Sequence, residues 1–294
     1  AARLGSPAAV VEEVAASRVA ALIASYPDAD EVQLISVEGS NDAPADPAAR
    51  DALERELRAH PALPAEAWAA LPRPGAPEHA VTLATLRFFT HGRRILERPA
   101  IAAALRRGGM RTSQSLYLPD PPLLAKLLPA VVRLAPPGGR LHLLPGYGAR
   151  AVSDQLPSWD ALRGAPVEVA LVTWLEFDGS MFLPQGWTRA LHDGAEAAST
   201  LPLAGVYANH WRVSGVEADA WMFAETAWRR RPYGELMGEY LGRVYGSGAA
   251  AAARAAQAAL EEATLHAYTR LFNVGFCWEA YYHRPYPEAE LARS

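Results

Sequence analysis

The feature that most constrains the fold is a regular alternation of short apolar segments with longer amphipathic ones. The strand candidates are residues 32–37, 112–118, 141–144, 167–177 and 203–211. Segments with helical spacing of apolar residues lie between them, at 78–107, 121–134 and 187–199. Because strands that are separated by helices normally pair in parallel, this pattern predicts an α/β fold with five parallel strands.

The number of strands suggests where this part of the chain belongs in a larger fold. A (β/α)8 TIM barrel has eight strands, so these units would be its later ones, with about three units upstream of Ala1. The chain starts without Met, which fits that expectation. An open doubly wound sheet is the alternative. No Gly-x-Gly-x-x-Gly follows a strand candidate, however, and no Walker phosphate loop occurs.

The pattern changes near residue 217. After it, only helices are predicted, at 218–230, at 233–245 and from 249 to about 272. We therefore expect a β/α barrel portion at 1–217 and a C-terminal helical region at 218–294 that packs on the barrel.

The charge and composition of the chain indicate which classes of binding partner to expect. The net charge of −4 and the absence of a basic stripe argue against nucleic acid. No apolar segment reaches the roughly 20 residues that span a bilayer, so no membrane partner is predicted. Cys277 is the only cysteine, and the eight histidines show neither His-x-x-x-His nor His-Glu-x-x-His spacing, so neither a metal nor a cofactor is expected. No signal peptide is visible, and localisation and homo-oligomer formation stay open.

The candidate site residues lie at the ends of the strands. In parallel β/α proteins, ligands bind at the carboxyl ends of the strands. These ends carry the polar and aromatic residues Glu38, Asn41, Asp42, Tyr117, Tyr147, Trp174, Glu176, Asp178, Asn209, His210 and Trp211. Aromatic rings stack on the apolar faces of sugars, and carboxylates and amides bond sugar hydroxyls, so the set predicts a carbohydrate substrate.

Three of these residues are candidates for catalysis. Glycoside hydrolysis uses two carboxyl groups, and Glu38, Glu176 and Asp178 could supply them. Glu176 and Asp178 are two residues apart on one strand, so both should share a face with Trp174. The remaining residues of the set would bind the sugar. A non-catalytic carbohydrate-binding barrel, or a lyase or isomerase that acts on a sugar acid, remains open as an alternative.

Two stretches of the chain resemble a known family. Residues 32–42, Val-Gln-Leu-Ile-Ser-Val-Glu-Gly-Ser-Asn-Asp, resemble a strand-plus-Asn-Asp segment of bacterial barrel proteins related to α-glucuronidases and to uncharacterised glycoside hydrolases near them. Residues 223–228, Phe-Ala-Glu-Thr-Ala-Trp, with the aromatic and glycine residues of 233–246, are similar to the helices that follow the barrel in those enzymes.

The resemblance implies a barrel glycosidase with a helical domain packed against it. The chain departs from the family at 43–46, where Ala-Pro-Ala-Asp stands in place of Cys-x-Cys-type residues. It also has Val37 before Glu38, where hexosaminidase-like barrels have an Asp-Glu pair.

Overall fold

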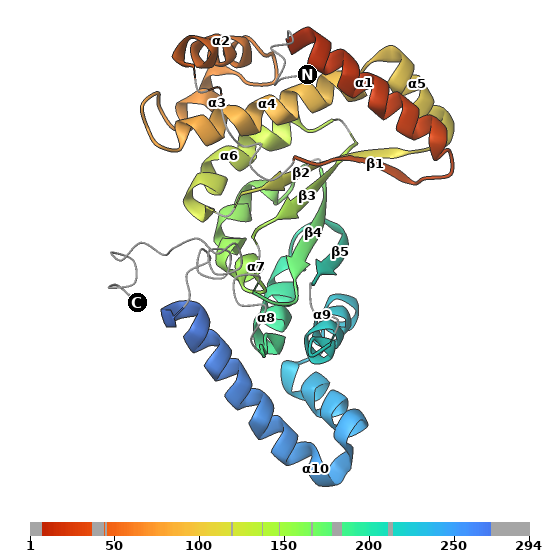
Figure 1. Ribbon diagram of the computed structural model, residues 1–294, viewed down its shortest axis with the longest axis vertical. Coiled ribbons are helices and arrows are strands. Elements are labelled where there is room, and N and C mark those ends of the chain that lie inside the picture. Colours follow the sequence, from red (N-terminus) through yellow and green to blue (C-terminus); the bar gives the residue numbers. More distant parts are fainter. Residues whose placement is uncertain are drawn as a thin grey trace, which may run out of the picture. The chain divides into compact units, whose positions relative to one another are not determined.

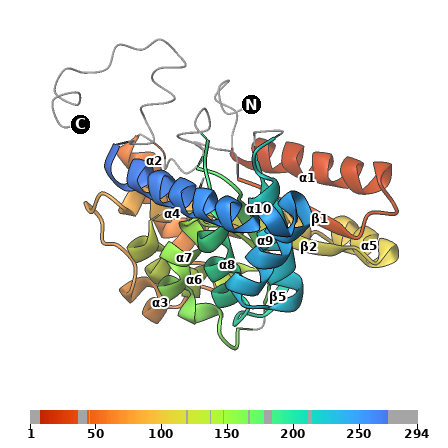
Figure 2. The same cartoon turned by 90° about the horizontal axis from the view of Figure 1, so that it is seen from below.

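The computed structural model describes residues 8–36, 44, 46–118, 120–136, 138–146, 148–165, 167–177, 184–210 and 214–271 (Figures 1 and 2). The chain forms two compact units. Unit 1 contains Ala1–Leu144, Pro157–Ala170 and Pro202–Gly205. Unit 2 contains Pro145–Leu156, Leu171–Leu201 and Val206–Ser294.

Five strands form one parallel sheet, as the sequence predicts. They are β1 (Glu31–Leu34), β2 (Arg111–Tyr117), β3 (Arg140–Leu144), β4 (Glu168–Trp174) and β5 (Leu203–Asn209). Their order in the sheet follows their order in the chain, β1-β2-β3-β4-β5. A doubly wound sheet reverses its order at a switch point, and the described strands show no such reversal.

Unit 1 contains six α-helices among its described residues. They are α1 (Ala8–Ser25), α2 (Pro47–Arg58), α3 (Ala65–Ala69), α4 (His79–Leu96), α5 (Pro99–Gly108) and α6 (Pro121–Leu134). One of them, α6, has the predicted bounds. The segment expected as one helix at 78–107 is two helices. Pro99 begins the second one, because proline suits the first helical turn and cannot continue the hydrogen bonding of the preceding helix.

Unit 2 contains α7 (Ala151–Gln155), α8 (Thr188–Ala198), α9 (Glu217–Arg229), α10 (Tyr233–His266) and a π-helical turn at Ala267–Leu271. A 3-10 segment, Leu156–Leu162, follows α7. Gly246 has φ 72° and ψ 163°, so α10 is two helical arms that meet at this residue. The two helices predicted on either side of Gly246 are thus confirmed. No helix in the described part of the chain is long and apolar enough to cross a membrane.

In unit 1, helices cover one face of the sheet. Val32 is buried in a cluster with Val19 of α1, Ile95 of α4 and Ile101 of α5, three helices that Figure 1 shows on one side of β1 and β2. Gln114 of β2 points to the same side, because its Nε2 donates to the carbonyls of α4 at Phe88 and Phe89 (3.4 and 3.5 Å). Since side chains alternate along a strand, the residues next to Val32 and Gln114 in the chain, such as Glu31 and Ser113, project from the opposite face.

Unit 2 has a corresponding core. Leu175 and Phe177, just past the end of β4, are buried with Trp187 and Leu191 of the α8 region and with Phe223 of α9. A second cluster joins α9 to α10 through Met222, Leu236, Met237 and Leu241. The helices of unit 2 therefore cover the face of β4 to which Leu175 and Phe177 point.

The contact between α4 and β2 leads to a stability prediction. A Cβ at Gly92 would overlap the amide nitrogen of Gln114 and lie 3.1 Å from Cδ1 of Leu34. We expect Gly92→Ala to lower the free energy of unfolding by about 1–3 kcal/mol, because the buried Gln114 must shift. Gly242→Ala in α10 is the matched control, since a Cβ there meets nothing within 4 Å. The control should keep or raise stability, by up to about 1 kcal/mol, through helix propensity. Urea unfolding of both variants checks this; equal midpoints would contradict the packing argument.

Candidate functional site

The predicted site residues divide between the described and the undescribed parts of the chain. Those outside the described residues are Glu38, Asn41, Asp42, Tyr147, Asp178 and Trp211. Tyr117 ends β2 in unit 1. Trp174, Glu176, Asn209 and His210 belong to unit 2, where their arrangement can be compared.

Glu176 is fully buried, with 0% of its surface exposed. The chain remains paired beyond the end of β4, because the N–H of Leu175 donates to the carbonyl of Asn209 (3.0 Å). Leu175 and Phe177 both point into the core formed with α8 and α9. Strand alternation therefore directs Glu176 and Trp174 to the face that these helices do not cover.

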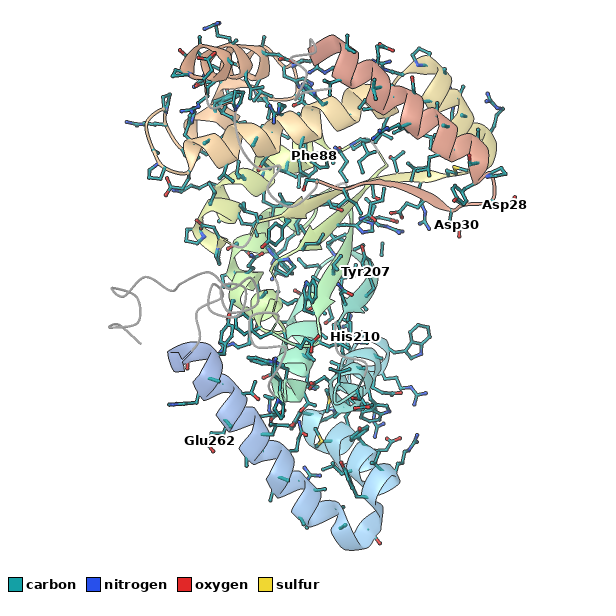
Figure 3. All side chains as sticks on the ribbon, in the orientation of Figure 1. Asp28, Asp30, Phe88, Tyr207, His210 and Glu262 are labelled. Carbon is teal, nitrogen blue, oxygen red and sulfur yellow. The ribbon has the colours of Figure 1, made fainter. Side chains whose placement is uncertain are left out.

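The end of β5 presents side chains to the same face. Val206 and Ala208 pack against the core that contains Leu175, so Tyr207 and Asn209 alternate to the other side. We call Trp174, Glu176, Tyr207 and Asn209 the site face of unit 2. Tyr207 is 42% exposed and lies near the end of β5 (Figure 3). Tyr207 is not among the predicted site residues, although its spacing of two from Asn209 is a signal that could have found it.

His210 follows the last residue of β5 and is exposed (Figure 3). Trp174 differs from it, since only 7% of its surface is exposed. The predicted residues at the ends of β4 and β5 therefore include a buried carboxyl, a buried indole and an exposed imidazole.

A buried amide holds the backbone next to Glu176. Gln185 Oε1 accepts from the N–H of Phe177 (2.8 Å), and its Nε2 donates to the carbonyl of the same residue (3.1 Å). The indole N–H of Trp187 also donates to Gln185 Oε1 (2.7 Å). The Gln185 side chain thus pairs with Phe177 as a neighbouring strand would. Nothing in the local sequence marks this role, because the two residues meet only in the folded chain.

The start of α8 is capped by side chains from distant helices. Trp187 is its N-cap residue and offers no side-chain cap. The N–H of Gly186 instead donates to Thr264 (3.0 Å), that of Trp187 to Asp219 (2.9 Å) and that of Arg189 to Glu261 (3.0 Å). These bonds satisfy amide groups that a helix leaves without internal partners.

A cavity of about 540 Å³ lies beside this helix start. It is lined by Arg150, Ser153, Gly186, Trp187, Arg189, Ala190, Asp193, Ala258, Glu261, Glu262 and Leu265. None of the predicted site residues in the described part of the chain lines it. The guanidinium of Arg189 lies 3.7 Å from the ring centre of Tyr233, so this cation is held against an aromatic face.

A separate polar cluster occupies unit 1, at the amino ends of the strands. Glu31 Oε2 accepts from Arg140 (2.6 Å), while its Oε1 contacts Ser113 (2.5 Å) and His142 Nε2 (2.8 Å). Arg140 also donates to Glu168 (3.1 Å). None of these residues is among the predicted site residues, which all lie at the carboxyl ends of the strands. The serine and the histidine both bond the carboxylate rather than each other, so this is not a nucleophile–base pair.

The cluster shifts the pKa values of its members. Burial lowers the pKa of His142, and the bond and charge of Glu31 offset this only in part. Burial would raise the pKa of Glu31, but the hydrogen bonds from Ser113 and His142 and the charge of Arg140 together hold it below its ordinary value.

Comparison of the chain with protein-family models, with curated proteins and with solved structures finds no match. The resemblance to barrel proteins related to α-glucuronidases therefore remains a prediction from the residues alone.

The Gln185 contacts predict a local effect on stability. Gln185→Ala leaves the buried N–H and carbonyl of Phe177 without that partner, which should cost about 1–3 kcal/mol. Hydrogen exchange at the Phe177 amide should become faster. Gln257→Ala on α10 is the control and should change stability by less than about 0.5 kcal/mol. An unchanged exchange rate at Phe177 in Gln185→Ala would show that the amide does not hold this backbone.

The polar cluster predicts a dependence of stability on pH. The pKa of folded His142 lies below its ordinary 6.5, so the unfolded chain binds the proton first and stability falls as the pH drops below that value. The pKa of folded Glu31 lies below its ordinary 4.5, so its contribution is lost as the pH falls through the acid range under 4.5.

Replacing His142 tests its contribution to this dependence of stability on pH. In His142→Gln, the free energy of unfolding should depend less steeply on pH between about 7 and 5. Residue 142 then no longer binds a proton more readily in the unfolded chain than in the folded one. Urea titrations at a series of pH values measure the slope. A slope identical to that of the original chain would contradict the assignment.

Proposed function

We propose that the chain is part of a (β/α)8 barrel glycoside hydrolase in which Glu176 is one of the two catalytic carboxyl groups. One observation carries the proposal: Glu176 is a fully buried carboxyl just past the end of β4, on the side opposite to the one that packs on the described helices α8 and α9. In barrel enzymes, catalytic residues come from this end of the strands.

The distribution of helices supports the barrel. A doubly wound sheet has helices on both faces, whereas a barrel has them only on the outside. In unit 1, the covered face carries Val32 and Gln114, and the opposite face carries Glu31, Ser113 and His142. In unit 2, Leu175 is on the covered face and Glu176 on the other. Polar side chains on the uncovered face of both units favour a barrel interior.

The site face of unit 2 suits a sugar. The carboxyl of Glu176 could protonate the leaving oxygen of a glycosidic bond, which is the task of the general acid. Trp174 offers an apolar wall, and Asn209 and Tyr207 offer hydrogen-bonding groups for hydroxyls. Glu38 and Asp178, the other two catalytic candidates from the sequence, lie outside the described residues.

Replacement of Glu176 tests the proposal. The chain should hydrolyse at least one member of a panel of aryl glycosides that includes glucuronides. Glu176→Gln should lower kcat by about a hundredfold or more, with a small change in KM, because it removes the proton donor and keeps the shape. Glu168→Gln is the matched control, since Glu168 lies on the same strand at its amino end. This control should keep its activity.

The possible results separate the alternatives. Activity of Glu176→Gln close to that of the original chain would remove Glu176 from the mechanism. Binding of glycans without hydrolysis of any aryl glycoside by the original chain would instead favour the non-catalytic barrel. Circular dichroism of the variant shows whether a loss of activity reflects unfolding.

A further inference from the structure

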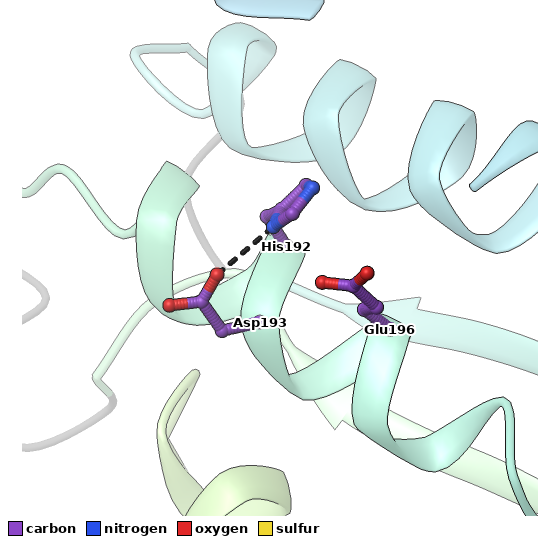
Figure 4. Close-up of side chains that lie close together, drawn as sticks. All are labelled: His192, Asp193 and Glu196. Atoms are coloured by element: carbon purple, nitrogen blue, oxygen red, sulfur yellow. Dashed lines mark hydrogen bonds and ion pairs between the residues drawn. The ribbon is translucent and has the colours of Figure 1, made fainter. Parts of the chain in front are cut away.

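Three side chains on α8 place metal-binding atoms close together. His192, Asp193 and Glu196 each offer one such atom, and these atoms all lie within 4.8 Å of one another (Figure 4). His192 is 5% exposed, while the two carboxylates are exposed to solvent. All three residues belong to unit 2.

The hydrogen bonds of His192 determine which ring nitrogen carries a proton. Its Nε2 lies 3.0 Å from the carbonyl oxygen of Arg231. A carbonyl oxygen only accepts, so Nε2 must carry the hydrogen. In the neutral ring, Nδ1 then has a lone pair, and this atom lies 2.9 Å from Oδ1 of Asp193. A carboxylate oxygen is also only an acceptor. A second ring proton or a metal ion is needed to hold these two atoms together.

The surroundings favour the metal ion. Histidines that bind a metal commonly donate their other N–H to a backbone carbonyl, as His192 does to Arg231. Two ligand atoms that are each about 2.1 Å from a tetrahedral Zn²⁺ ion lie about 3.4 Å apart. Nδ1 and Oδ1 are 2.9 Å apart, so a small movement of the exposed Asp193 side chain would reach that spacing. A second proton on the His192 ring would pair with Asp193 alone. A metal ion could also bind Glu196, which lies one helical turn further along α8.

The ring is fixed before any ion binds. It meets the ring of Tyr233 edge to face, with 5.7 Å between ring centres, and its burial limits rotation. The exposed Asp193 and Glu196 can adjust to a preferred geometry. One fixed imidazole with two adaptable carboxylates gives a site with positions left for water.

We propose that His192, Asp193 and Glu196 bind one divalent transition-metal ion, with Zn²⁺ as the best fit. One imidazole and two carboxylates suit such an ion, and the two negative charges match its positive charge. The site goes beyond the proposed function and does not depend on it. All three ligands lie on α8, and the ion would hold the His192 ring in the orientation in which it bonds the carbonyl of Arg231, between α9 and α10.

No metal was expected from the sequence, because paired histidines and multiple cysteines are absent from it. This site has the spacing His-Asp-x-x-Glu, with a single histidine. The sequence does not show that the imidazole is buried or that its far nitrogen meets the carbonyl of Arg231.

Metal titration of the full chain, freed of metal with a chelator, tests the proposal. Co²⁺ should produce a saturable absorption band with one ion per chain, and Zn²⁺ should displace it. Asp193→Asn and Glu196→Gln should each weaken Zn²⁺ binding by at least about tenfold. Asp154→Asn on α7 is the matched control, because this exposed carboxylate pairs with Arg150 in the same helix and lies outside the group. It should bind Zn²⁺ as the original chain does.

Thermal unfolding provides a second measurement that does not depend on activity. Zn²⁺ should raise the Tm of the original chain and of Asp154→Asn, and raise it less in the two site variants, because a ligand stabilises the state that binds it. No saturable Co²⁺ band, or unchanged Zn²⁺ affinity in either site variant, would overturn the proposal. The absence of a saturable Co²⁺ band would instead favour a second ring proton on His192.

Discussion

The rest of the structure depends on the alternation of side chains along paired parallel strands. The register sets Val32 beside Thr112 and Gln114 beside Leu141, and the helices pack on the face that these residues share. A shift of one residue would exchange the faces and place Glu31 among the apolar side chains of α1, α4 and α5. The same rule acts in unit 2, where the burial of Leu175 and Phe177 among helices directs Glu176 away from them.

How much of this could be predicted depends on how local the cause is. The five strands follow from short-range patterns, and so does the shared face of Trp174 and Glu176. The break at Pro99 also has a local cause, although one helix was expected over 78–107. The bond of Gln185 to Phe177 spans eight residues and the capping of α8 by Glu261 joins residues far apart in the chain, and neither contact has a sequence pattern of its own. A carboxyl can therefore be placed on a face from the sequence, but what fixes the backbone beside it cannot.

The carboxylate of Glu31, at the amino ends of the strands, is held by several hydrogen-bond donors. At the amino ends, Glu31 accepts bonds from Arg140, Ser113 and His142, so its charge is matched within the cluster. A carboxylate held by that many donors is stabilised in its ionised form and makes a poor proton donor. Carboxyl groups of this kind hold strands in register. Glu31 also lies at the amino ends of the strands, whereas Glu176 lies just past the carboxyl end of β4, where barrel enzymes carry their catalytic residues, so Glu176 rather than Glu31 is the proposed reacting group.

Helix α8 connects the two proposals within unit 2. Leu191 packs in the core with Leu175 and Phe177, the neighbours of Glu176 in the chain, and the next residue, His192, bonds the carbonyl of Arg231. Any shift of α8 on ion binding would therefore move the packing behind Glu176. Thermodynamic linkage then requires the effect to be reciprocal: if the ion changes the affinity for a sugar, the sugar changes the affinity for the ion by the same factor. If α8 is rigid in both states, the ion adds stability alone, and the two sites are independent.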